Sequence, residues 1–262
     1  MKKSMLIRIL TSAVLIAIVV PIVYLGGAFL NGLLVVVACL GAYEIANLSQ
    51  DTQDWILTCI YAIAIICLVF IPHDYFLVGL VSLLVALFVY YLFVAKTYTL
   101  DHLVYSFLMI LLVTLAMRSI LTLYRNGYGF VGLLYVAFAT FLCDAGAYFI
   151  GSRYGKRKLI PDISPNKTIE GALGGYACGA IGSFLFGVIA CKQLPIGLLI
   201  LSSLLLPAVA QVGDISFSAI KRRYGIKDFG SLLPGHGGIF DRIDSLIFTL
   251  MVFHALLILW GI

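Results

Sequence analysis

Apolar runs long enough to cross a lipid bilayer fill most of this chain. A helix of roughly 17–25 apolar residues crosses the hydrocarbon core. Open strands cannot satisfy their backbone groups in lipid, so such runs must be helical. The sequence therefore predicts an all-α, polytopic integral membrane protein with about nine transmembrane helices. They are expected at about 6–25, 27–47, 54–72, 75–95, 103–123, 129–151, 170–191, 194–213 and 243–261.

The composition agrees with a membrane protein and excludes an ordinary soluble domain. The chain is 63% hydrophobic and 11% charged, with a mean hydropathy of +1.12, whereas about a quarter of the residues in soluble domains are charged. We expect one membrane domain over residues 1–262, with a helical bundle at 1–125 and a catalytic half at 126–262. The first apolar run is interpreted as an uncleaved helix rather than a signal peptide. No nucleic-acid partner is expected.

Positive charges predict the orientation of these helices. If the N-terminus lies inside, 14 of the 17 Lys and Arg residues fall on the inner side, and only Arg118, Arg125 and Lys192 fall outside. Because positive charge concentrates on the cytoplasmic side, we expect a cytoplasmic N-terminus. The two long charged loops, 152–169 and 214–242, would then face the cytoplasm, where nucleotides are found.

Residues 214–244 carry an unusual concentration of charge between two apolar helices. They hold four of the 12 acidic and five of the 17 basic residues. If the eighth helix continues past the membrane surface, Gln211, Asp214, Ser218 and either Lys221 or Arg222 share one of its faces. Such a stripe could hold a metal ion and its phosphate ligands. Snorkelling is the alternative for the cations, but it does not explain Asp214.

A glycine-rich turn, Leu233–Gly238, follows this stripe. Three glycines in four residues exclude a regular helix and let backbone N–H groups approach an anion. His236 lies inside the turn and could contact a phosphate or a leaving group. Most such turns only connect helices, but this one is flanked by Lys227 and Arg242, which makes a phosphate site the stronger interpretation.

Three aspartates near the ninth helix suggest a site for a hard cation. Asp241 and Asp244 are three residues apart in its predicted first turn, where negative charge suits the helix dipole. Together with Asp214 they form an oxygen-ligand set typical of Mg²⁺. Capping of the helix N-terminus is the alternative role for Asp241.

Two further polar features belong to the second half. Asp144 lies within the sixth apolar run, about 10 Å from its cytoplasmic end, and ionisable groups at such depth are candidates for function. The small residues after it, Ala145–Ala147, would let another helix approach. In the segment Ser164–Gly171, Ser164 before a proline is expected to cap the seventh helix, with Thr168 as the competing cap. Lys167 adds positive charge where helix N-termini bind phosphate.

These residues resemble a known family. From Ser218 to Asp244 the chain reads Ser-x-Ile-Lys-Arg, Lys-Asp-x-Gly, Leu-Pro-x-His-Gly-Gly-Ile and Asp-Arg-Ile-Asp. With these spacings it looks like the complete signature of the phosphatidate cytidylyltransferase (CDP-diacylglycerol synthase) family. Asp144 and the segment Ser164–Gly171 are similar to that family as well, although Asn166 and Ile169 stand where other members often carry Lys and Trp.

The resemblance is specific over about residues 140–250, and it implies both a reaction and a set of roles. The reaction is the transfer of the cytidylyl group of CTP to phosphatidate, giving CDP-diacylglycerol and pyrophosphate. A Mg²⁺ cofactor, a possible second cation, a homodimer and an active site on the cytoplasmic face of a bacterial cell membrane are implied too. The metal carboxylates would be Asp214, Asp241 and Asp244. The catalytic residues would be Lys221, Arg222, Lys227, His236, Arg242 and Asp144. The substrate-binding residues would be Ser164, Lys167, Thr168, Ser218, Gly237 and Gly238.

Three other functions remain alternatives. An ion-coupled secondary transporter could use Asp144 and Asp214 to carry protons or sodium, but no inverted repeat is visible. A CDP-alcohol phosphotransferase would need an Asp-Gly-x-x-Ala-Arg motif, which is absent. A CTP-dependent lipid or polyprenol kinase is the hardest to separate by chemistry, and its products would distinguish it.

Overall fold

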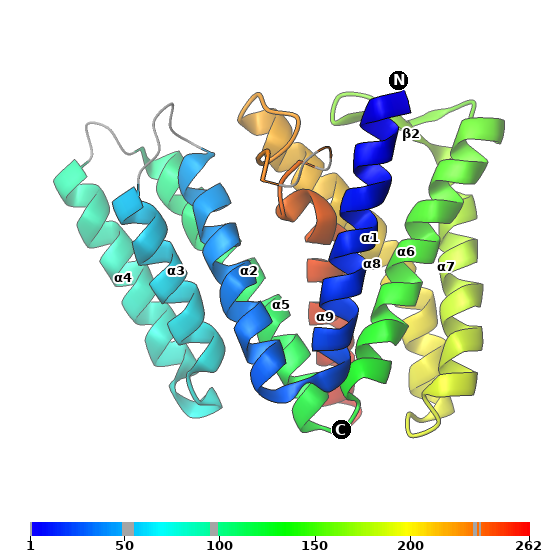
Figure 1. The fold of residues 1–262 in the computed structure, drawn as a ribbon, viewed down its shortest axis with the longest axis horizontal. Coiled ribbons are helices and arrows are strands. Elements are labelled where there is room, and N and C mark those ends of the chain that lie inside the picture. The colour runs from blue at the N-terminus through cyan, green and yellow to red at the C-terminus, as the bar shows by residue number, and fades with distance from the viewer. Residues whose placement is uncertain (1, 49–54, 95–98, 233–234, 236) are drawn as a thin grey trace. The chain divides into compact units, whose positions relative to one another are not determined.

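The computed structural model describes residues 2–48, 55–94, 99–232, 235 and 237–262, and nine α-helices make up most of this part of the chain (Figure 1). They coincide closely with the nine predicted apolar runs. The helices are α1 (Lys2–Leu25), α2 (Gly27–Asn47), α3 (Trp55–Phe70), α4 (Phe76–Val94), α5 (Leu100–Arg125), α6 (Gly129–Tyr154), α7 (Ile169–Ala190), α8 (Ile196–Arg223) and α9 (Phe240–Leu259). A short 3₁₀ turn, His73–Tyr75, precedes α4.

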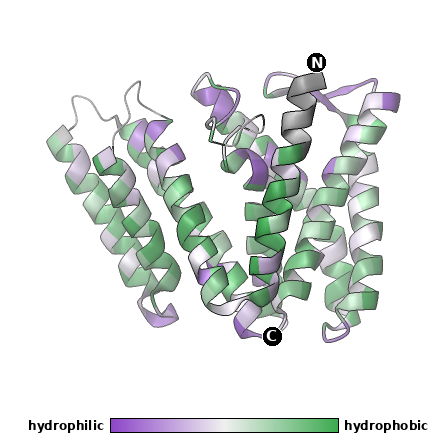
Figure 2. Ribbon diagram, in the orientation of Figure 1, coloured by the Kyte–Doolittle hydropathy of each residue, from purple (hydrophilic) through white to green (hydrophobic). Residues whose placement is uncertain are grey.

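Most of these helices are built to cross a membrane. Among the described residues, seven helices are long and apolar enough to do so, whereas α3, with 16 residues, and the stretch Leu10–Leu25 of α1 are shorter. Figure 2 shows hydrophobic colour along the helices and hydrophilic colour mainly in the segments that connect them. The chain is therefore an all-α polytopic integral membrane protein, as predicted, while the count of nine spans stays a prediction.

Helix α4 shows the lipid-facing character of the surface most plainly. Leu77, Leu92 and Phe93 are 68%, 74% and 86% exposed, and only 11% of its most apolar stretch is buried inside the protein. Exposed apolar area of this extent marks an interaction surface on a protein in water. On a membrane protein it is the surface that the lipid chains cover.

The chain divides into two compact units. The first comprises Met1–Arg118 together with Asp228–Asp241, and the second comprises Ser119–Lys227 together with Arg242–Ile262. The division we predicted lay after residue 125. The charged segment 228–241 thus belongs with the N-terminal helices, although it lies more than a hundred residues later in the sequence.

In the first unit, helices α1 to α4 pack against one another in chain order, and polar contacts join α5 to α3. The hydroxyl of Tyr61 donates a 2.8 Å hydrogen bond to Ser106 Oγ. The guanidinium of Arg118 donates to the carbonyls of Leu68 and Ile71 at 2.8 and 2.9 Å. Because the last carbonyls of a helix lack intrahelical partners, Arg118 caps the C-terminal end of α3.

In the second unit, a seam of small residues holds α7 against α6. Gly171, Gly175, Gly179, Ser183 and Gly187 recur every four residues along α7, and all are buried. Their spacing places them on one face, where small side chains let two helix backbones come close. On α6, a Cβ added to Gly146 would lie 2.7 Å from Cys178 Cβ. The close approach predicted for Ala145–Ala147 is therefore confirmed.

A β-hairpin that we did not predict precedes α7. Its strands, β1 (Lys158–Ile160) and β2 (Ser164–Thr168), are antiparallel, with Lys158 opposite Thr168. The predicted cap at Ser164 is wrong, because Ser164 and Pro165 lie in β2. The competing cap is confirmed: Thr168 Oγ1 accepts a 3.1 Å hydrogen bond from the Gly171 N–H. Proline at an exposed edge position leaves no ladder donor unsatisfied, so the extended segment tolerates Pro165.

Candidate functional site

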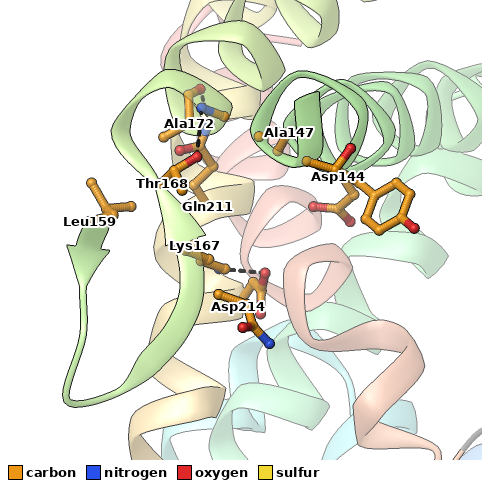
Figure 3. Close-up of a pocket in the computed structure, with 13 residues that line it drawn as sticks. Asp144, Ala147, Leu159, Lys167, Thr168, Ala172, Gln211 and Asp214 are labelled. Atoms are coloured by element: carbon orange, nitrogen blue, oxygen red, sulfur yellow. Dashed lines mark hydrogen bonds and ion pairs between the residues drawn. The ribbon is translucent and has the colours of Figure 1, made fainter. Parts of the chain in front are cut away.

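A cavity of about 480 Å³ opens in the second unit (Figure 3). Helices α6, α7 and α8 and both strands of the hairpin contribute to its walls. Its volume is within the range of small-molecule pockets, roughly 300–1,000 Å³. The lining residues are Asp144, Ala147, Tyr148, Gly151, Ser152, Leu159, Asn166, Lys167, Thr168, Gly171, Ala172, Gln211 and Asp214.

An ion pair joins the hairpin to α8 inside this cavity. Lys167 Nζ lies 2.5 Å from Asp214 Oδ2, and the two side chains are 26% and 31% exposed (Figure 3). Lys167 comes from β2 and Asp214 from the middle of α8. Two residues that the sequence assigned to phosphate and metal binding are therefore in direct contact, although 47 positions separate them.

Two more carboxylates belong to the same cluster. Asp144, from α6, faces the cavity, and both Asp214 and Asp244 act on it electrostatically, as does Lys167. Asp244 stands one turn into α9, and its Oδ1 accepts a 2.7 Å hydrogen bond from the Ser245 N–H. We call Asp144, Asp214 and Asp244 the acidic cluster. Three helices, α6, α8 and α9, supply one carboxylate each.

Two carboxylates of the acidic cluster, those of Asp144 and Asp214, line the cavity and would need further ligands to hold a metal ion. Among the described residues, no three His, Cys, Asp or Glu side chains stand ready to hold a metal ion by themselves. Mg²⁺ usually keeps several waters and binds through one or two carboxylates plus substrate phosphates. Hard oxygen donors facing a cavity of this size therefore fit Mg²⁺, provided that phosphate and water complete its shell.

The polar stripe of α8 continues beyond the cluster, because the helix extends to Arg223, ten residues past the predicted apolar run 194–213. Gln211 donates a 2.9 Å hydrogen bond to the Ala172 carbonyl, which joins α8 to α7. Arg222 donates to the carbonyls of Ile163 and Ile226 at 3.2 and 3.0 Å. The guanidinium thus braces the turn of the hairpin against the end of α8.

The other polar residues predicted along and beyond α8 differ in their exposure. Lys221 and Ser218 are half-buried on α8, and Lys227, beyond the helix, is exposed. Their assigned roles with phosphate remain predictions.

Local contacts fix the hairpin that carries Lys167. Glu170 Oε2 accepts hydrogen bonds from the Lys156 and Arg157 N–H groups at 3.0 and 3.1 Å, and its Oε1 pairs with Arg157 Nε at 3.2 Å. Behind the hairpin, a Cβ on Gly171 would lie 2.9 Å from the Cα of Gly151. Only glycine at these positions allows α6 and α7 to meet this closely at the wall of the cavity.

The glycine-rich turn belongs to the first unit and has its own fixed geometry. Asp241 Oδ2 accepts hydrogen bonds from the N–H groups of Phe229 and Gly238, both at 2.9 Å. Both donors precede α9, so this carboxylate binds the backbone of the segment that leads into the helix. Gly237 has a φ of 82°, a conformation that glycine adopts most easily.

The structure describes only some of the other predicted residues of this region. His236, Leu233 and Pro234 lie outside the described residues. Arg242 is exposed in the first turn of α9. The structure thus brings together Asp144, Lys167, Asp214 and Asp244 in the second unit, whereas Asp241, Gly237 and Gly238 belong to the first.

One residue that contacts this region was not among the candidates predicted from the sequence. Glu44, near the C-terminal end of α2, accepts hydrogen bonds from the N–H groups of Ile239 and Phe240. The signal was present, because Glu44 interrupts the apolar run Ala42–Ala46, and an ionisable residue in such a run is a candidate for function.

Comparisons with known proteins agree with the resemblance seen in the sequence. The model of the cytidylyltransferase family matches residues 6–260. A Bacillus subtilis (strain 168) protein is 38% identical over 177 residues, which cover 67% of this chain and 65% of that relative. Relatives from Staphylococcus epidermidis (strain ATCC 12228 / FDA PCI 1200) and Staphylococcus aureus (strain COL) are 35% and 33% identical, each covering 97% of this chain and 99% of the relative. All three are named phosphatidate cytidylyltransferase. The chain belongs to the cytidylyltransferase family.

Proposed function

We propose that this protein transfers the cytidylyl group of CTP to phosphatidate, which yields CDP-diacylglycerol and pyrophosphate. The observation that carries the proposal is the cavity in which Lys167 pairs with Asp214 beside Asp144. Relatives that share 97% of the chain's length and carry the name of this activity support it. The same name argues against the transporter alternative.

The reaction does not require the protein to act as a strong base. An oxygen of the phosphatidate phosphate attacks the α-phosphorus of CTP, the bond from that phosphorus to the bridging oxygen breaks, and pyrophosphate leaves with the electron pair. The attacking phosphate is already an anion near neutral pH. The site must instead align two polyanions and stabilise the charge that develops, which is an electrostatic task. We therefore expect direct in-line transfer without a covalent enzyme intermediate.

Lys167 and the acidic cluster divide this task. We assign Asp214 and Asp244 to Mg²⁺, with Asp144 beside them. Bound Mg²⁺ would neutralise charge on the triphosphate and on the departing pyrophosphate. The Lys167 ammonium, which pairs with Asp214, can move onto a phosphate oxygen when substrate enters, because both partners are anionic oxygens within reach of one flexible side chain.

The remaining polar residues surround the two substrates in this proposal. The cations Lys221, Lys227 and Arg242 and the hydroxyls of Ser164, Thr168 and Ser218 contact phosphate or nucleotide. A phosphate role for His236, Gly237 and Gly238 rests on the family resemblance alone. Arg222 acts differently, since its hydrogen bonds to Ile163 and Ile226 hold the hairpin in place.

We propose that the site works at the inner surface of a bacterial cell membrane. The excess of Lys and Arg on one side supports a cytoplasmic N-terminus with nine spans. The bacterial relatives support the cell membrane. The family resemblance supports a homodimer. A soluble nucleotide and a membrane lipid can meet only at such an interface.

The test is to follow each phosphorus of CTP. The purified protein in vesicles containing phosphatidate and Mg²⁺ is given CTP labelled at either the α- or the γ-phosphorus. We expect the α label in the lipid product and the γ label in pyrophosphate. Recovery of the γ label in lipid would indicate a CTP-dependent kinase instead, and absence of both labels from lipid would reject the proposal.

A further inference from the structure

Glu44 is a charged residue in a place where charge is costly. Its side chain is 1% exposed, and it is the one Asp, Glu, Lys, Arg or His among the fully buried polar residues of the described chain. It lies on α2, three residues before the C-terminal end of the helix at Asn47. A buried carboxylate without hydrogen-bond partners would be strongly destabilising, so its partners show what it does.

Both carboxylate oxygens of Glu44 bind the start of α9. Oε1 accepts a hydrogen bond of 2.6 Å from the Ile239 N–H, and Oε2 accepts one of 3.1 Å from the Phe240 N–H. The first N–H groups of a helix have no intrahelical partners, and a carboxylate there also suits the helix dipole. Glu44 therefore caps α9 from a helix nearly two hundred residues earlier in the chain.

The signature segment, Ser218 to Asp244, has backbone atoms packed closely against this carboxylate. A Cβ on Gly238 would lie 2.5 Å from Glu44 Oε1, and a Cβ on Gly230 would lie 3.3 Å from the same atom. Phe240, fully buried, packs so that a Cβ on Gly41 would touch its ring at 3.2 Å. Two glycines of the segment are thus explained by close contact with Glu44, without invoking a phosphate.

Asp241 completes the anchoring from within the segment. Its Oδ2 binds the N–H groups of Phe229 and Gly238, while Glu44 binds the next two N–H groups, those of Ile239 and Phe240. The rings of Phe229 and Phe240 meet edge to face, with centroids 5.6 Å apart. Three consecutive backbone donors, 238 to 240, are therefore held by two carboxylates.

We infer that Glu44 is a positioning residue for the cytidylyl transfer. It fixes the first turn of α9, and Arg242 and Asp244 follow on the same helix. Glu44 therefore helps to orient these two side chains, which the proposed function places at the substrate. This inference rests on that proposed function. Preorganised groups matter because a small misplacement of a reacting or stabilising group costs a large factor in rate.

A purely structural role for Glu44 can be separated from positioning with a matched control. Arg118 is also a charged side chain of the first unit that satisfies backbone groups at a helix end, but at the end of α3, with Leu68 and Ile71. The variants Glu44→Gln and Arg118→Met each remove one charge from such a cap. In Glu44→Gln, an amide NH₂ faces a backbone N–H, and one of the two hydrogen bonds is lost.

The experiment compares kcat, KM and amide exchange for these variants at temperatures where all are folded. We expect Glu44→Gln to lower kcat about 10–100-fold, with the KM for phosphatidate within about threefold. Backbone amides 237–242 should exchange at least tenfold faster. If Arg118→Met lowers Tm as much as Glu44→Gln does, its kcat should still stay within about twofold of the native value. A kcat loss no larger for Glu44→Gln than for Arg118→Met would overturn the inference.

A gentler variant covers the case in which Glu44→Gln does not fold. Gly230→Ala places a methyl group at 3.3 Å from Oε1 and so pushes the segment by a few tenths of an ångström. It should lower kcat by about 3–10-fold, whereas Gly32→Ala, with open space around its Cβ, should leave kcat unchanged. Equal kcat for both alanine variants and the native chain would contradict positioning.

The two proposals can fail separately. If the native protein forms no CDP-diacylglycerol, the proposed function is wrong. The exchange rates of amides 237–242 then still decide whether Glu44 holds the turn. If the native protein is active but Glu44→Gln leaves both exchange and kcat unchanged, only the inference about Glu44 is wrong.

Discussion

Two charged segments of this protein lead into helix N-termini, and they are anchored in opposite ways. The hairpin before α7 is held by residues close to it in sequence: Thr168 caps its own helix, and Glu170 binds the amides of Lys156 and Arg157. The segment before α9 is held by Glu44, which lies almost two hundred positions away. One anchor is local, and the other depends on the fold of the N-terminal helices.

The two anchors hold different parts of the predicted site, one in each unit of the chain. The local anchor keeps Lys167 beside Asp214 within the second unit. The distant anchor ties the signature turn to the apolar N-terminal helices, which carry no recognisable motif. Those helices therefore do more than contact lipid, because they supply the carboxylate on which the turn is built.

The largest effect that we expect from the hairpin follows the loss of Lys167. Lys167→Met removes the cation that pairs with Asp214 and that we assign to a substrate phosphate. We expect kcat/KM for CTP to fall by about 100–1,000-fold, as for loss of one preorganised charged donor. Steady-state kinetics in vesicles measure this change.

The control for this variant is Lys158→Met on β1, an exposed lysine of the same hairpin. It should change kcat/KM by less than about threefold, because a surface charge contributes little. Equal losses for the two variants would mean that only the net charge of the hairpin matters.

A moderate effect should follow loss of the local cap. Thr168→Ala removes the acceptor for the Gly171 N–H, and the loss of such a cap costs about 0.5–2 kcal/mol. Thermal unfolding in detergent should show a Tm lower by a few degrees, and Thr168→Ser should retain most of the native value. Identical Tm values for the alanine and serine variants would show that the hydroxyl does not anchor the hairpin.

The smallest effect should come from the exposed ion pair of the hairpin. Arg157→Ala removes the partner of Glu170 Oε1, but the Arg157 side chain is 74% exposed, and surface pairs of this kind contribute little. Glu170 keeps its two backbone donors. We expect Tm to change by no more than about 1 °C. A larger drop would mean that the local anchor depends on this pair rather than on the backbone contacts.

Local patterns in the sequence were enough to predict the helices and most of the polar cluster. Apolar run length located the helices, and spacing along α8 placed Asp214 and Lys221 on a continuous helix. The pairing of Lys167 with Asp214 could not be read from spacing, since it depends on the hairpin that folds back over α8. Ser164 was assigned as the cap because proline commonly follows a cap, yet the strand register moved the true cap to Thr168.

Glu44 shows the limit of local reasoning most clearly. Its partners are backbone amides, which carry no sequence signature, and they belong to a segment that the chain reaches only after six more α-helices. An acidic residue within an apolar run is visible in the sequence, but its partner is not. Only the packing of residues 228–241 on α2 reveals it.

The most direct test of the account is whether the acidic cluster binds a divalent ion. Binding of Mn²⁺, in place of Mg²⁺, is measured by the loss of the free-ion EPR signal for the native protein and for the double variant Asp214→Asn, Asp244→Asn, each with CTP present at equal concentration. We predict at least tenfold weaker binding of the Mn²⁺–CTP complex by the variant, because hard cations require anionic oxygen ligands. Equal binding by the two proteins would contradict the assignment of these carboxylates to the metal.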